Sequence, residues 1–268
     1  MPDAEPNRKD LKLVEELGRE AGAIALSYFG KDPEVWWKEG DSPVSQADFA
    51  VDAFLKEKLL EARPDYGWLS EETEDSDERL GALRTFVVDP IDGTRGFING
   101  MDRWCVSIAV VEDNRPVVGV LVAPVLQQTL SAALGVGTML DGGTASVRAP
   151  TDTLIMTGPR PFLNATEDFA DRAVEKTPFI PSLAWRLAMV AMGEIDVALA
   201  RGSARDWDLA AADLIVHEAG GRLTDMRSKA LSYNCPSTRQ GSLVASNADH
   251  HDEMLDLARR AMNKQRQA

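Results

Sequence analysis

Cysteine is scarce in this chain of 268 residues, which contains only Cys105 and Cys235. The two lie far apart, so no disulfide framework is expected, and such cysteine usage is typical of a reducing compartment. No apolar stretch approaches the roughly 20 residues that a membrane-spanning helix needs. The first residues, Met1 to Glu5, are polar and acidic with no apolar run behind them. The sequence therefore predicts a cytoplasmic protein with no signal peptide and no stable membrane insertion.

Positive charge is also in short supply, because the formal net charge is −14. This excess of carboxylates disfavours a nucleic-acid polymer or an anionic membrane as a partner. It does not disfavour a small phosphate ester, because a bound divalent cation inverts the local charge. Histidine is rare as well, with three residues. We expect His217 to be structural or on the surface, and His250 and His251 to form an exposed helix start.

The apolar pattern predicts two halves. Helices are expected at about 9–29, 46–60, 167–175, 182–192, 207–217 and 250–262. Strands are expected at about 85–88, 104–111, 117–125, 129–133, 153–156, 195–200 and 243–246. The clustered strands of the first half suggest an antiparallel meander, and the alternating elements of the second suggest an α/β half. The glycine-rich segment Gly135–Gly143 is the expected boundary, which gives an N-terminal half over 1–140 and a C-terminal half over 141–268.

The most informative stretch is Asp-Pro-Ile-Asp-Gly-Thr, which begins at Asp89 directly after a short apolar run. The proline fixes φ and removes a backbone donor, so we expect the chain to turn there. The carboxylates of Asp89 and Asp92, with the Ile91 carbonyl, are the oxygen ligands that Mg²⁺ prefers. Gly93 lets its own N–H group and that of Thr94 approach a phosphate closely. An Asp-Gly surface turn is the alternative, but it does not explain the first aspartate, the proline and the threonine together.

Two further carboxylate clusters are weaker signals when each is taken alone. Glu71 and Glu72 follow a short apolar run and begin an acidic segment, most of which is a solvated loop. Asp206 and Asp208 open a predicted helix, and an aspartate there caps the helix and suits its dipole. One aspartate is enough for capping, so the other is open to a different role.

Taken together, these elements resemble the inositol monophosphatase superfamily of Mg²⁺-dependent, typically lithium-sensitive phosphatases. The family shows an apolar-x-Glu-Glu element, then Asp-Pro-Ile-Asp-Gly-Thr, then Trp-Asp-x-Ala-Ala with Glu-Ala-Gly-Gly at the helix end. An upstream Ser-Pro-Val-Thr-x-Ala-Asp segment completes the set. The matching segments, in order along the chain, are Asp41–Asp48, Leu69–Glu72, Asp89–Thr94, Trp207–Ala211 and Glu218–Gly221. Here Ser45 replaces the commoner threonine, and Ser70 replaces a glycine often seen before the glutamate pair.

This resemblance implies a layered αβαβα sandwich that combines an α+β half with an α/β half. It also implies a phosphomonoester hydrolase that binds two or three Mg²⁺ ions per active site. The implied metal ligands are Glu71, Asp89, the Ile91 carbonyl, Asp92 and Asp208. The implied catalytic residues are Asp48, Glu71 and Thr94. Thr94, oriented by Asp48, would position or deprotonate the attacking water, and Gly93 with Thr94 would bind phosphate. A plain helix-start carboxylate is the alternative for Asp48.

Haloacid-dehalogenase phosphatases also carry an Asp/Gly/Thr signature after an apolar strand, and their first aspartate is a covalent nucleophile. Their two aspartates are two residues apart, whereas Asp89 and Asp92 are three apart. The proline between them has no counterpart in that motif. A covalent aspartyl-phosphate is therefore not expected here.

Substrate choice depends on the segment before Asp208. Inositol-specific relatives carry a glutamate seven residues before the aspartate of the Trp-Asp motif, where it accepts hydrogen bonds from sugar hydroxyls. This chain has Arg201 at that position, and arginine suits a second phosphate or another anionic group better than a polyol. Arg186 is another candidate anion contact. A surface arginine is the alternative for both.

With Arg201, the Ser-Glu-Glu element and the segment Arg95–Ile98 after the loop, the chain most resembles the bacterial 3′(2′),5′-bisphosphate nucleotidase branch. The resemblance implies hydrolysis of adenosine 3′,5′-bisphosphate, a small phosphorylated metabolite of sulfate assimilation, by water attack. Inositol-1-phosphate and histidinol-phosphate phosphatases are the alternatives. A metal-binding regulatory homologue without turnover is more remote, because all the expected carboxylates are present. Relatives are often dimers, so a homodimer is implied as well.

Overall fold

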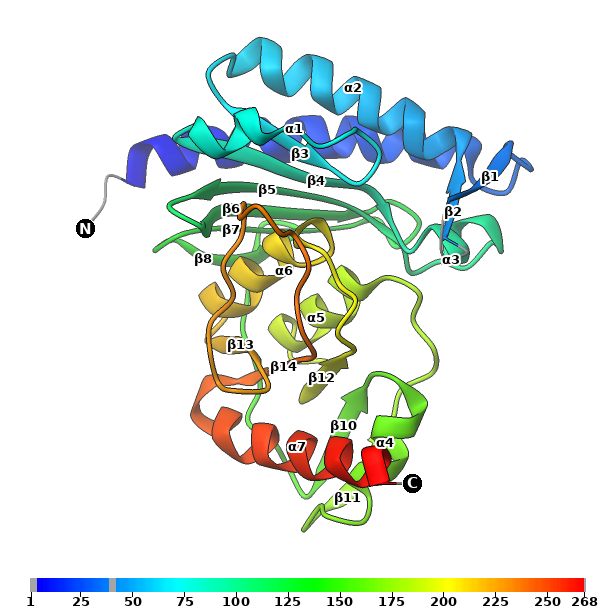
Figure 1. Ribbon diagram of the computed structural model, residues 1–268, viewed down its shortest axis with the longest axis vertical. Helices are drawn as coiled ribbons and strands as arrows, with labels where there is room; N and C mark the ends of the chain where they lie inside the picture. The colour runs from blue at the N-terminus through cyan, green and yellow to red at the C-terminus, as the bar shows by residue number, and fades with distance from the viewer. Residues whose placement is uncertain (1–3, 39–41, 268) are drawn as a thin grey trace.

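The computed structural model describes residues 4–38 and 42–267, and it arranges them in alternating layers of helices and sheets (Figure 1). From the top of Figure 1 downward, a helix pair covers a seven-stranded sheet, and a second helix pair separates that sheet from a five-stranded one above the last two helices. The three pairs are α1 (Ala4–Tyr28) with α2 (Gln46–Ala62), α5 (Leu183–Ala191) with α6 (Asp206–Glu218), and α4 (Arg160–Thr166) with α7 (His251–Gln267). This order confirms the predicted αβαβα sandwich. Asp41, part of the upstream element of the sequence, lies outside the described residues.

The upper sheet contains β3 to β9 in sequence order. Its strands are β3 (Gly67–Ser70), β4 (Arg84–Asp92), β5 (Cys105–Glu112), β6 (Arg115–Ala123), β7 (Gln128–Ala133), β8 (Gly137–Leu140) and β9 (Gly143–Ala145). Strands β3 and β4 are parallel, and every other neighbouring pair is antiparallel. The antiparallel meander predicted for the first half is therefore confirmed, with β3 added as a parallel edge.

Both faces of the upper sheet are buried, and β5 shows how the sequence achieves this. Because successive side chains of a strand point to opposite faces, Val106 and Ile108 join the core beneath α1 and α2, whereas Cys105 and Ala109 join the core beside α5 and α6. A strand that is covered on both sides reads as a continuous apolar run. This is why the strand at 104–111 could be predicted.

Helix α6 packs directly against the lower face of the upper sheet. Gly119 of β6 makes this contact possible, because a Cβ atom there would lie 2.6 Å from the carbonyl oxygen of Ala211. The buried alanines 210–212 present only small side chains to the sheet. Since α6 also contacts β4 and β5, its N-terminus lies close to the end of β4.

The lower sheet has the strand order β11-β10-β12-β14-β13. Its strands are β10 (Thr153–Thr157), β11 (Ala173–Lys176), β12 (Val197–Ala200), β13 (Gly221–Asp225) and β14 (Leu243–Asn247). The helix predicted at 167–175 is wrong. Helix α4 begins earlier, because Pro161 lies in its first turn, where a fixed φ and a missing N–H group are tolerated. Strand β11 instead pairs in parallel with β10 at the edge of the sheet.

The glycine-rich segment Gly135–Gly143 lies inside the upper sheet. It contains β8, and its glycines serve tight turns, as the positive φ angles of Gly135 and Gly137 show. The sheet ends only at Ala145. One core cluster includes α5 and α6 together with strands of both sheets. The division at residue 140 into two halves therefore stays a prediction.

Several short elements lie at the periphery of the layers. They are the hairpin of β1 (Val35–Lys38) and β2 (Ser42–Ser45), helix α3 (Thr94–Ile98), and the 3-10 helices η1 (Asp77–Gly81) and η2 (Ala248–His250). Cys105 and Cys235 are both free thiols, as expected. Within residues 4–38 and 42–267, no helix combines the length and the apolar character that crossing a membrane requires.

The sequence predicted an exposed His251, and this prediction is wrong. The side chain is fully buried at the start of α7. Its Nε2 atom lies 2.8 Å from the Thr224 hydroxyl and its Nδ1 atom lies 2.9 Å from the Ser246 hydroxyl. Burial lowers the pKa of His251 to about 4. The nearby charge of Arg222 acts in the same direction, and Asp252 acts against it. The neutral ring thus links α7 to the lower sheet.

This burial predicts how acid affects stability. Below a pH of about 6.5 the unfolded chain protonates His251 whereas the folded chain does not, so this contribution to stability is complete above pH 6.5 and is lost as the pH falls toward 4. Relative to a His251→Gln variant, wild type should lose on the order of 1 kcal/mol more unfolding free energy between pH 7 and pH 5. Urea unfolding of both proteins measures this, since the carboxylate contributions cancel in the difference. Parallel pH profiles would show that His251 is not buried neutral.

Candidate active site

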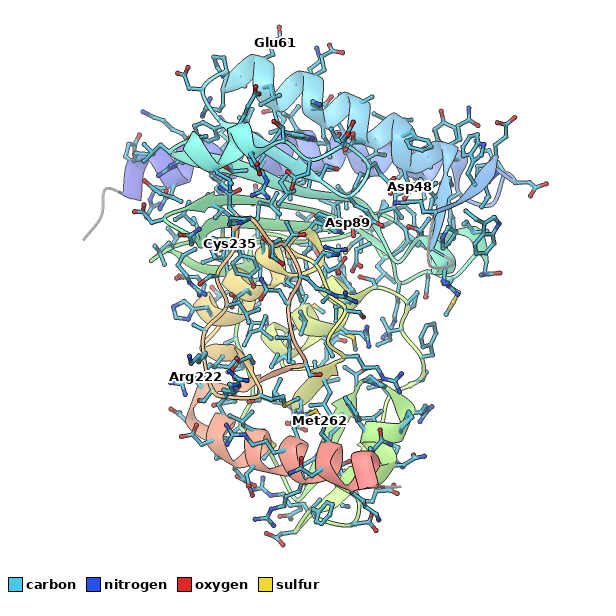
Figure 2. All side chains as sticks on the ribbon, viewed as in Figure 1. Asp48, Glu61, Asp89, Arg222, Cys235 and Met262 are labelled. Atoms are coloured by element: carbon cyan, nitrogen blue, oxygen red, sulfur yellow. The ribbon has the colours of Figure 1, made fainter. Side chains whose placement is uncertain are left out.

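The parallel pair β3 and β4 brings two distant carboxylates together. Ser70 is the register partner of Val88, so Glu71 and Asp89 follow at the same edge of the sheet. The Glu71 N–H group donates to the Val88 carbonyl at 3.2 Å, which continues the strand pairing for one more residue. Asp89 lies on the lower face of the sheet, toward α6, with 1% of its surface exposed (Figure 2).

A third carboxylate, Asp208, comes from the first turn of α6. The Trp207 carbonyl accepts a hydrogen bond from Ser107, the register partner of Asp89, so the start of α6 is attached to the sheet at this point. One carboxylate oxygen from each of Glu71, Asp89 and Asp208 lies within 4.8 Å of the others. Burial and the neighbouring carboxylates raise the pKa of Asp89 and that of Asp208 well above the ordinary value. This converging set of oxygens fits a hard divalent cation such as Mg²⁺, which would remove the repulsion.

The predicted turn at the proline of the motif is wrong, because β4 continues to Asp92. The register with β5 shifts between Asp89 and Asp92, which leaves the proline and Ile91 in a bulge. Such a bulge gives an extra residue room within a strand and re-aims the side chains on either side. The turn comes at Gly93, with φ of +97°, where a Cβ atom would lie 3.0 Å from the Ser182 nitrogen.

Asp92 lies in the same cavity as the three clustered carboxylates but is held by other partners. Its Oδ2 atom accepts hydrogen bonds from the Ser182 hydroxyl and, at 2.6 Å, from the Ala184 N–H group, both at the N-terminus of α5. Burial raises the pKa of Asp92 to about 6 despite these hydrogen bonds. The cavity has a volume of about 210 Å³. It is lined by Pro43, Glu71, Asp89, Ile91, Asp92, Gly93, Thr94, Arg95, Phe179, Pro181 and Asp208.

Thr94 and Asp48 form a hydrogen-bonded pair at the edge of this cavity. The Thr94 hydroxyl lies 3.2 Å from Asp48 Oδ1 and 3.0 Å from the Ile91 carbonyl. Asp48 is in the first turn of α2, where its Oδ2 atom accepts from the N–H group and the hydroxyl of Ser45. One oxygen therefore caps the helix while the other faces Thr94, so the two interpretations of Asp48 are compatible. Burial raises the pKa of Asp48 to about 6.

Comparison with known proteins agrees with this geometry. The model of the inositol monophosphatase family matches residues 7–263. The chain belongs to this family. It is 34% identical to the histidinol-phosphatase of Mycobacterium tuberculosis, over 92% of this chain and 96% of that protein. It is 30% identical to the 3′(2′),5′-bisphosphate nucleotidase CysQ of Aggregatibacter actinomycetemcomitans, over 84% of this chain and 87% of that one. The structure of the Thermotoga maritima IMPase superposes with a TM-score of 0.79 at 27% identity, over 96% of this chain and 98% of that one.

The family is one of phosphatases, and the two relatives named above remove phosphate groups, so the chain is an inositol monophosphatase-family phosphatase. The relatives act on different substrates at similar sequence identity, which leaves the substrate to the structure of the site.

Lys38 is a residue of the site that the sequence did not reveal. Its ammonium group lies 3.1 Å from Glu71 and 2.6 Å from Glu72. Burial alone would lower the pKa of Lys38, but the two glutamates outweigh this effect and raise it. Burial in turn raises the pKa of Glu72 to about 7. Lys38 comes from the β1–β2 hairpin, more than 30 residues away in sequence, and no local pattern announces such a partner.

The glutamate pair is also anchored from α2. Asp52 accepts hydrogen bonds from the Ser70 hydroxyl and, at 2.6 Å, from the Thr73 hydroxyl, one on each side of the pair. The Glu72 N–H group donates back to the Ser70 hydroxyl at 3.3 Å. Ser70, the departure from the family's usual glycine, therefore has a role in fixing the turn that carries Glu71.

Asp206 and Asp208 have separate roles at the start of α6. Asp208 Oδ2 accepts from the Arg205 N–H group at 2.7 Å, so this carboxylate caps the helix and also belongs to the cluster. Asp206 instead accepts from the Asn234 N–H group and the Gln240 amide, both at 2.8 Å. It holds the loop that precedes β14. It does not belong to the carboxylate cluster of Glu71, Asp89 and Asp208.

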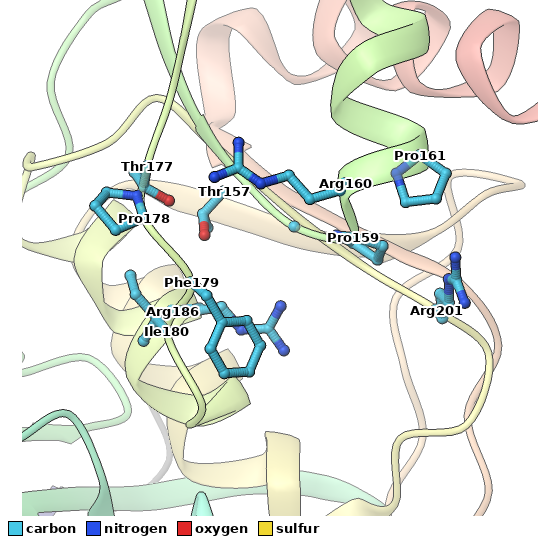
Figure 3. A pocket seen from close by; sticks show the side chains of 11 residues that line it. Thr157, Pro159, Arg160, Pro161, Thr177, Pro178, Phe179, Ile180, Arg186 and Arg201 are labelled. Atoms are coloured by element: carbon cyan, nitrogen blue, oxygen red, sulfur yellow. The ribbon is translucent and has the colours of Figure 1, made fainter. Parts of the chain in front are cut away.

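Beside the carboxylate cavity lies a second pocket of about 350 Å³ that contains both arginines singled out from the sequence (Figure 3). It is lined by Thr157, Gly158, Pro159, Arg160, Pro161, Thr177, Pro178, Phe179, Ile180, Arg186 and Arg201. Three of these residues are arginines and none is acidic. Arg160 was missed, because its place between two prolines is not a recognisable motif. The two cavities share Phe179.

The arginines of this pocket occupy different environments. Arg186 is partly buried, and its Nε atom donates to the Ser182 carbonyl at 3.2 Å. Burial lowers the pKa of Arg186, whereas the negative charges of Asp92 and Asp208 raise it, so these carboxylates are near enough to act on its charge. Arg201 is exposed at the opposite end, 5.8 Å above the ring of Phe162. The positive charge thus extends from the carboxylates to the outer rim of the pocket.

Proposed function

We propose that this phosphatase hydrolyses a phosphomonoester that carries a second phosphate, as adenosine 3′,5′-bisphosphate does, with Mg²⁺ as its cofactor. The observation that carries the proposal is the pocket with Arg160, Arg186 and Arg201, which adjoins the carboxylate cavity and has no acidic residue in its lining. A guanidinium binds a phosphate through charge-assisted, often bidentate hydrogen bonds. A polyol would leave three such donors without charged partners.

The chain's own residues divide the work of hydrolysis. Glu71, Asp89 and Asp208 would hold the metal, with Asp92 and the Ile91 carbonyl in the same cavity as further ligands. Bound Mg²⁺ supplies charge neutralisation at the phosphoryl oxygens and makes a water molecule more acidic. Gly93 and Thr94, at the turn into α3, line the same cavity, and their backbone N–H groups would bind the phosphate.

Thr94 and Asp48 would orient the attacking water and accept its proton. Asp48 Oδ1 lies within hydrogen-bond reach of the Thr94 hydroxyl. A pKa of about 6 leaves Asp48 mainly ionised at neutral pH, close enough to that pH to accept a proton efficiently. The hydroxyl can then donate to Asp48 while it accepts from the water.

Histidinol phosphate is the second candidate substrate, because a histidinol-phosphatase is 34% identical to this chain. It carries a protonated amine, which the arginine pocket would repel. The two substrates therefore respond with opposite signs to a change of charge in the pocket, and inositol-1-phosphate, which has neither group, should respond little.

Arg201→Glu tests this choice. It should lower kcat/KM for adenosine 3′,5′-bisphosphate by about tenfold or more, because a lost charge-assisted hydrogen bond is worth roughly 1.5–3 kcal/mol. The same change should raise kcat/KM for histidinol phosphate and leave that for inositol-1-phosphate within about twofold. Steady-state phosphate release with the three substrates measures these effects.

Arg19→Glu is the matched control, since Arg19 is an exposed arginine on α1 that forms a salt bridge with Glu15, one helical turn away. It makes the same change of net charge away from the pocket and should leave all three rates unaltered. Equal losses on the three substrates, or no loss on the bisphosphate, would remove the basis for a second phosphate. The cytoplasmic location and the homodimer stay predictions.

A further inference from the structure

Phe179 is a large apolar side chain that is exposed to solvent. With 71% of its surface exposed, it is among the most exposed large apolar residues of the part of the chain that the structure describes. It lies in the segment 178–181 (Pro-Phe-Ile-Pro), which connects β11 to α5. A single exposed apolar side chain is common on protein surfaces, so the role of this ring depends on where it lies.

The backbone on both sides of Phe179 is fixed. The two flanking prolines have a restricted φ. Ile180 is 2% exposed and belongs to the core around α5. Pro181 packs so closely on Gly96 that a Cβ atom there would lie 2.3 Å from the proline ring. Before Phe179, the Thr177 N–H group donates to the Met156 carbonyl at 2.9 Å. The exposed ring is therefore held on a backbone that is fixed on both sides.

The position of the ring is the informative feature. Phe179 is the residue shared by the carboxylate cavity and the arginine pocket. A substrate with one phosphate at the carboxylates and a second anionic group at the arginines must extend across it. In Figure 3 the ring lies beside Arg186 and Ile180, with Arg160 on the other side of the pocket.

A buried hydroxyl in the same pocket has no hydrogen-bond partner among the residues that the structure describes. It is the hydroxyl of Thr177, two residues before Phe179. A buried hydroxyl normally has a partner. A ring nitrogen or an exocyclic amine of a ligand lying on Phe179 is the kind of group that would supply one.

We propose that Phe179 is the platform on which a planar heteroaromatic ring of the substrate stacks, between the phosphate to be hydrolysed and the arginine pocket. The inference rests on the proposed function, which it deepens by assigning the part of the site that recognises the ring. Adenine and imidazole share this planar chemistry, whereas the ring of inositol is puckered and has no π face. Phe179 thus separates ring-bearing phosphate esters from polyol phosphates, and the arginines separate anionic from cationic members of the first class.

Two substitutions at this position form the test. Phe179→Leu keeps an apolar side chain but removes the aromatic face, and Phe179→Tyr keeps the face. Phe179→Leu should lower kcat/KM for adenosine 3′,5′-bisphosphate about tenfold, mostly through KM, within the range seen when a stacked aromatic is removed. Phe179→Tyr should restore it to within about threefold, and inositol-1-phosphate should not distinguish the three proteins. Histidinol phosphate should follow the adenosine compound, with a smaller loss because its ring is smaller.

Binding gives a readout that does not depend on turnover. Titration calorimetry should show that Phe179→Leu weakens adenosine 5′-phosphate about tenfold but leaves ribose 5-phosphate, which has no base, unchanged. Gel filtration of each variant should match wild type. A change of oligomeric state with equal losses on every substrate would overturn the proposal in favour of a contact between copies of the chain.

The outcomes separate this inference from the proposed function. If Arg201→Glu weakens adenosine 3′,5′-bisphosphate while Phe179→Leu does not, the stacking platform is wrong and the bisphosphate function stands. If Phe179→Leu weakens histidinol phosphate and the bisphosphate is not hydrolysed, the platform stands and the bisphosphate function is wrong. Turnover of inositol-1-phosphate alone would overturn both.

Discussion

Replacing Asp89 by Asn is expected to abolish Mg²⁺-dependent phosphatase activity. Asp89 is the most deeply buried of the three carboxylates whose oxygens converge within 4.8 Å. The family resemblance also implies that it would be a ligand of two of the Mg²⁺ ions. Asparagine keeps the size of the side chain but removes its charge. A misplaced or missing ion would forfeit several kcal/mol of transition-state stabilisation, so turnover should fall by about 10⁴-fold or more.

Loss of activity has to be separated from loss of the fold. The raised pKa of Asp89 shows that its charge is unfavourable in the metal-free protein, where burial and Glu71 oppose it. Asp89→Asn should therefore be at least as resistant to thermal unfolding as wild type without metal, yet gain less stability when Mg²⁺ is added. Thermal unfolding with and without Mg²⁺, alongside phosphate release, checks both effects. Asp113→Asn, in the exposed turn after β5, is the matched control. Near-normal turnover in a folded Asp89→Asn protein would contradict the shared-ligand role.

The parts of the fold that the sequence predicted well carry their signal in local periodicity. Helix α1 shows its apolar face at helical spacing, and β5 is an apolar run because both of its faces are covered. The elements that escaped are short and depend on distant partners. Strand β11 has only four residues and is defined by its pairing with β10, so the pattern around it was mistaken for a helix. The β1–β2 hairpin has the same character.

The candidate site divides along the same line. Asp89, Asp92 and Thr94 stand in one continuous motif, so chemistry and spacing identified them. Lys38 and Arg160 have no motif of their own, and only the folded chain brings them to the glutamate pair and to the arginine pocket. The prediction for His251 was wrong for a related reason, because its hydrogen-bond partners are hydroxyls from two strands of the lower sheet. A sequence reveals ligands that act as a local group, whereas partners recruited from other layers become visible only in the structure.

Thr94→Ala should reduce kcat by roughly 10²–10⁴-fold, the usual value of positioned proton transfer, with a much smaller change in KM. The hydroxyl of Thr94 lies between Asp48 and the Ile91 carbonyl, at 3.2 and 3.0 Å, and the methyl group of alanine cannot pass the proton of the attacking water to Asp48. Thr94→Ser keeps the hydroxyl and should recover most of the rate. Thr144→Ala, on the exposed edge strand β9, should leave the rate unchanged.

A double-mutant cycle on Thr94 and Asp48 tests their pairing more strictly than either substitution alone. If the two act as one proton path, Asp48→Asn should cause a loss of similar size, and the double variant should be little worse than either single one. Asp48 also caps α2 by accepting from the Ser45 N–H group, and the amide oxygen of asparagine can accept the same hydrogen bond, so the loss should appear in kcat rather than in thermal stability. Steady-state kinetics of the four proteins completes the cycle. Independent, multiplying losses would mean that the two residues serve different steps. A phosphoaspartate trapped during turnover would replace water attack with a covalent mechanism at Asp89 or Asp92.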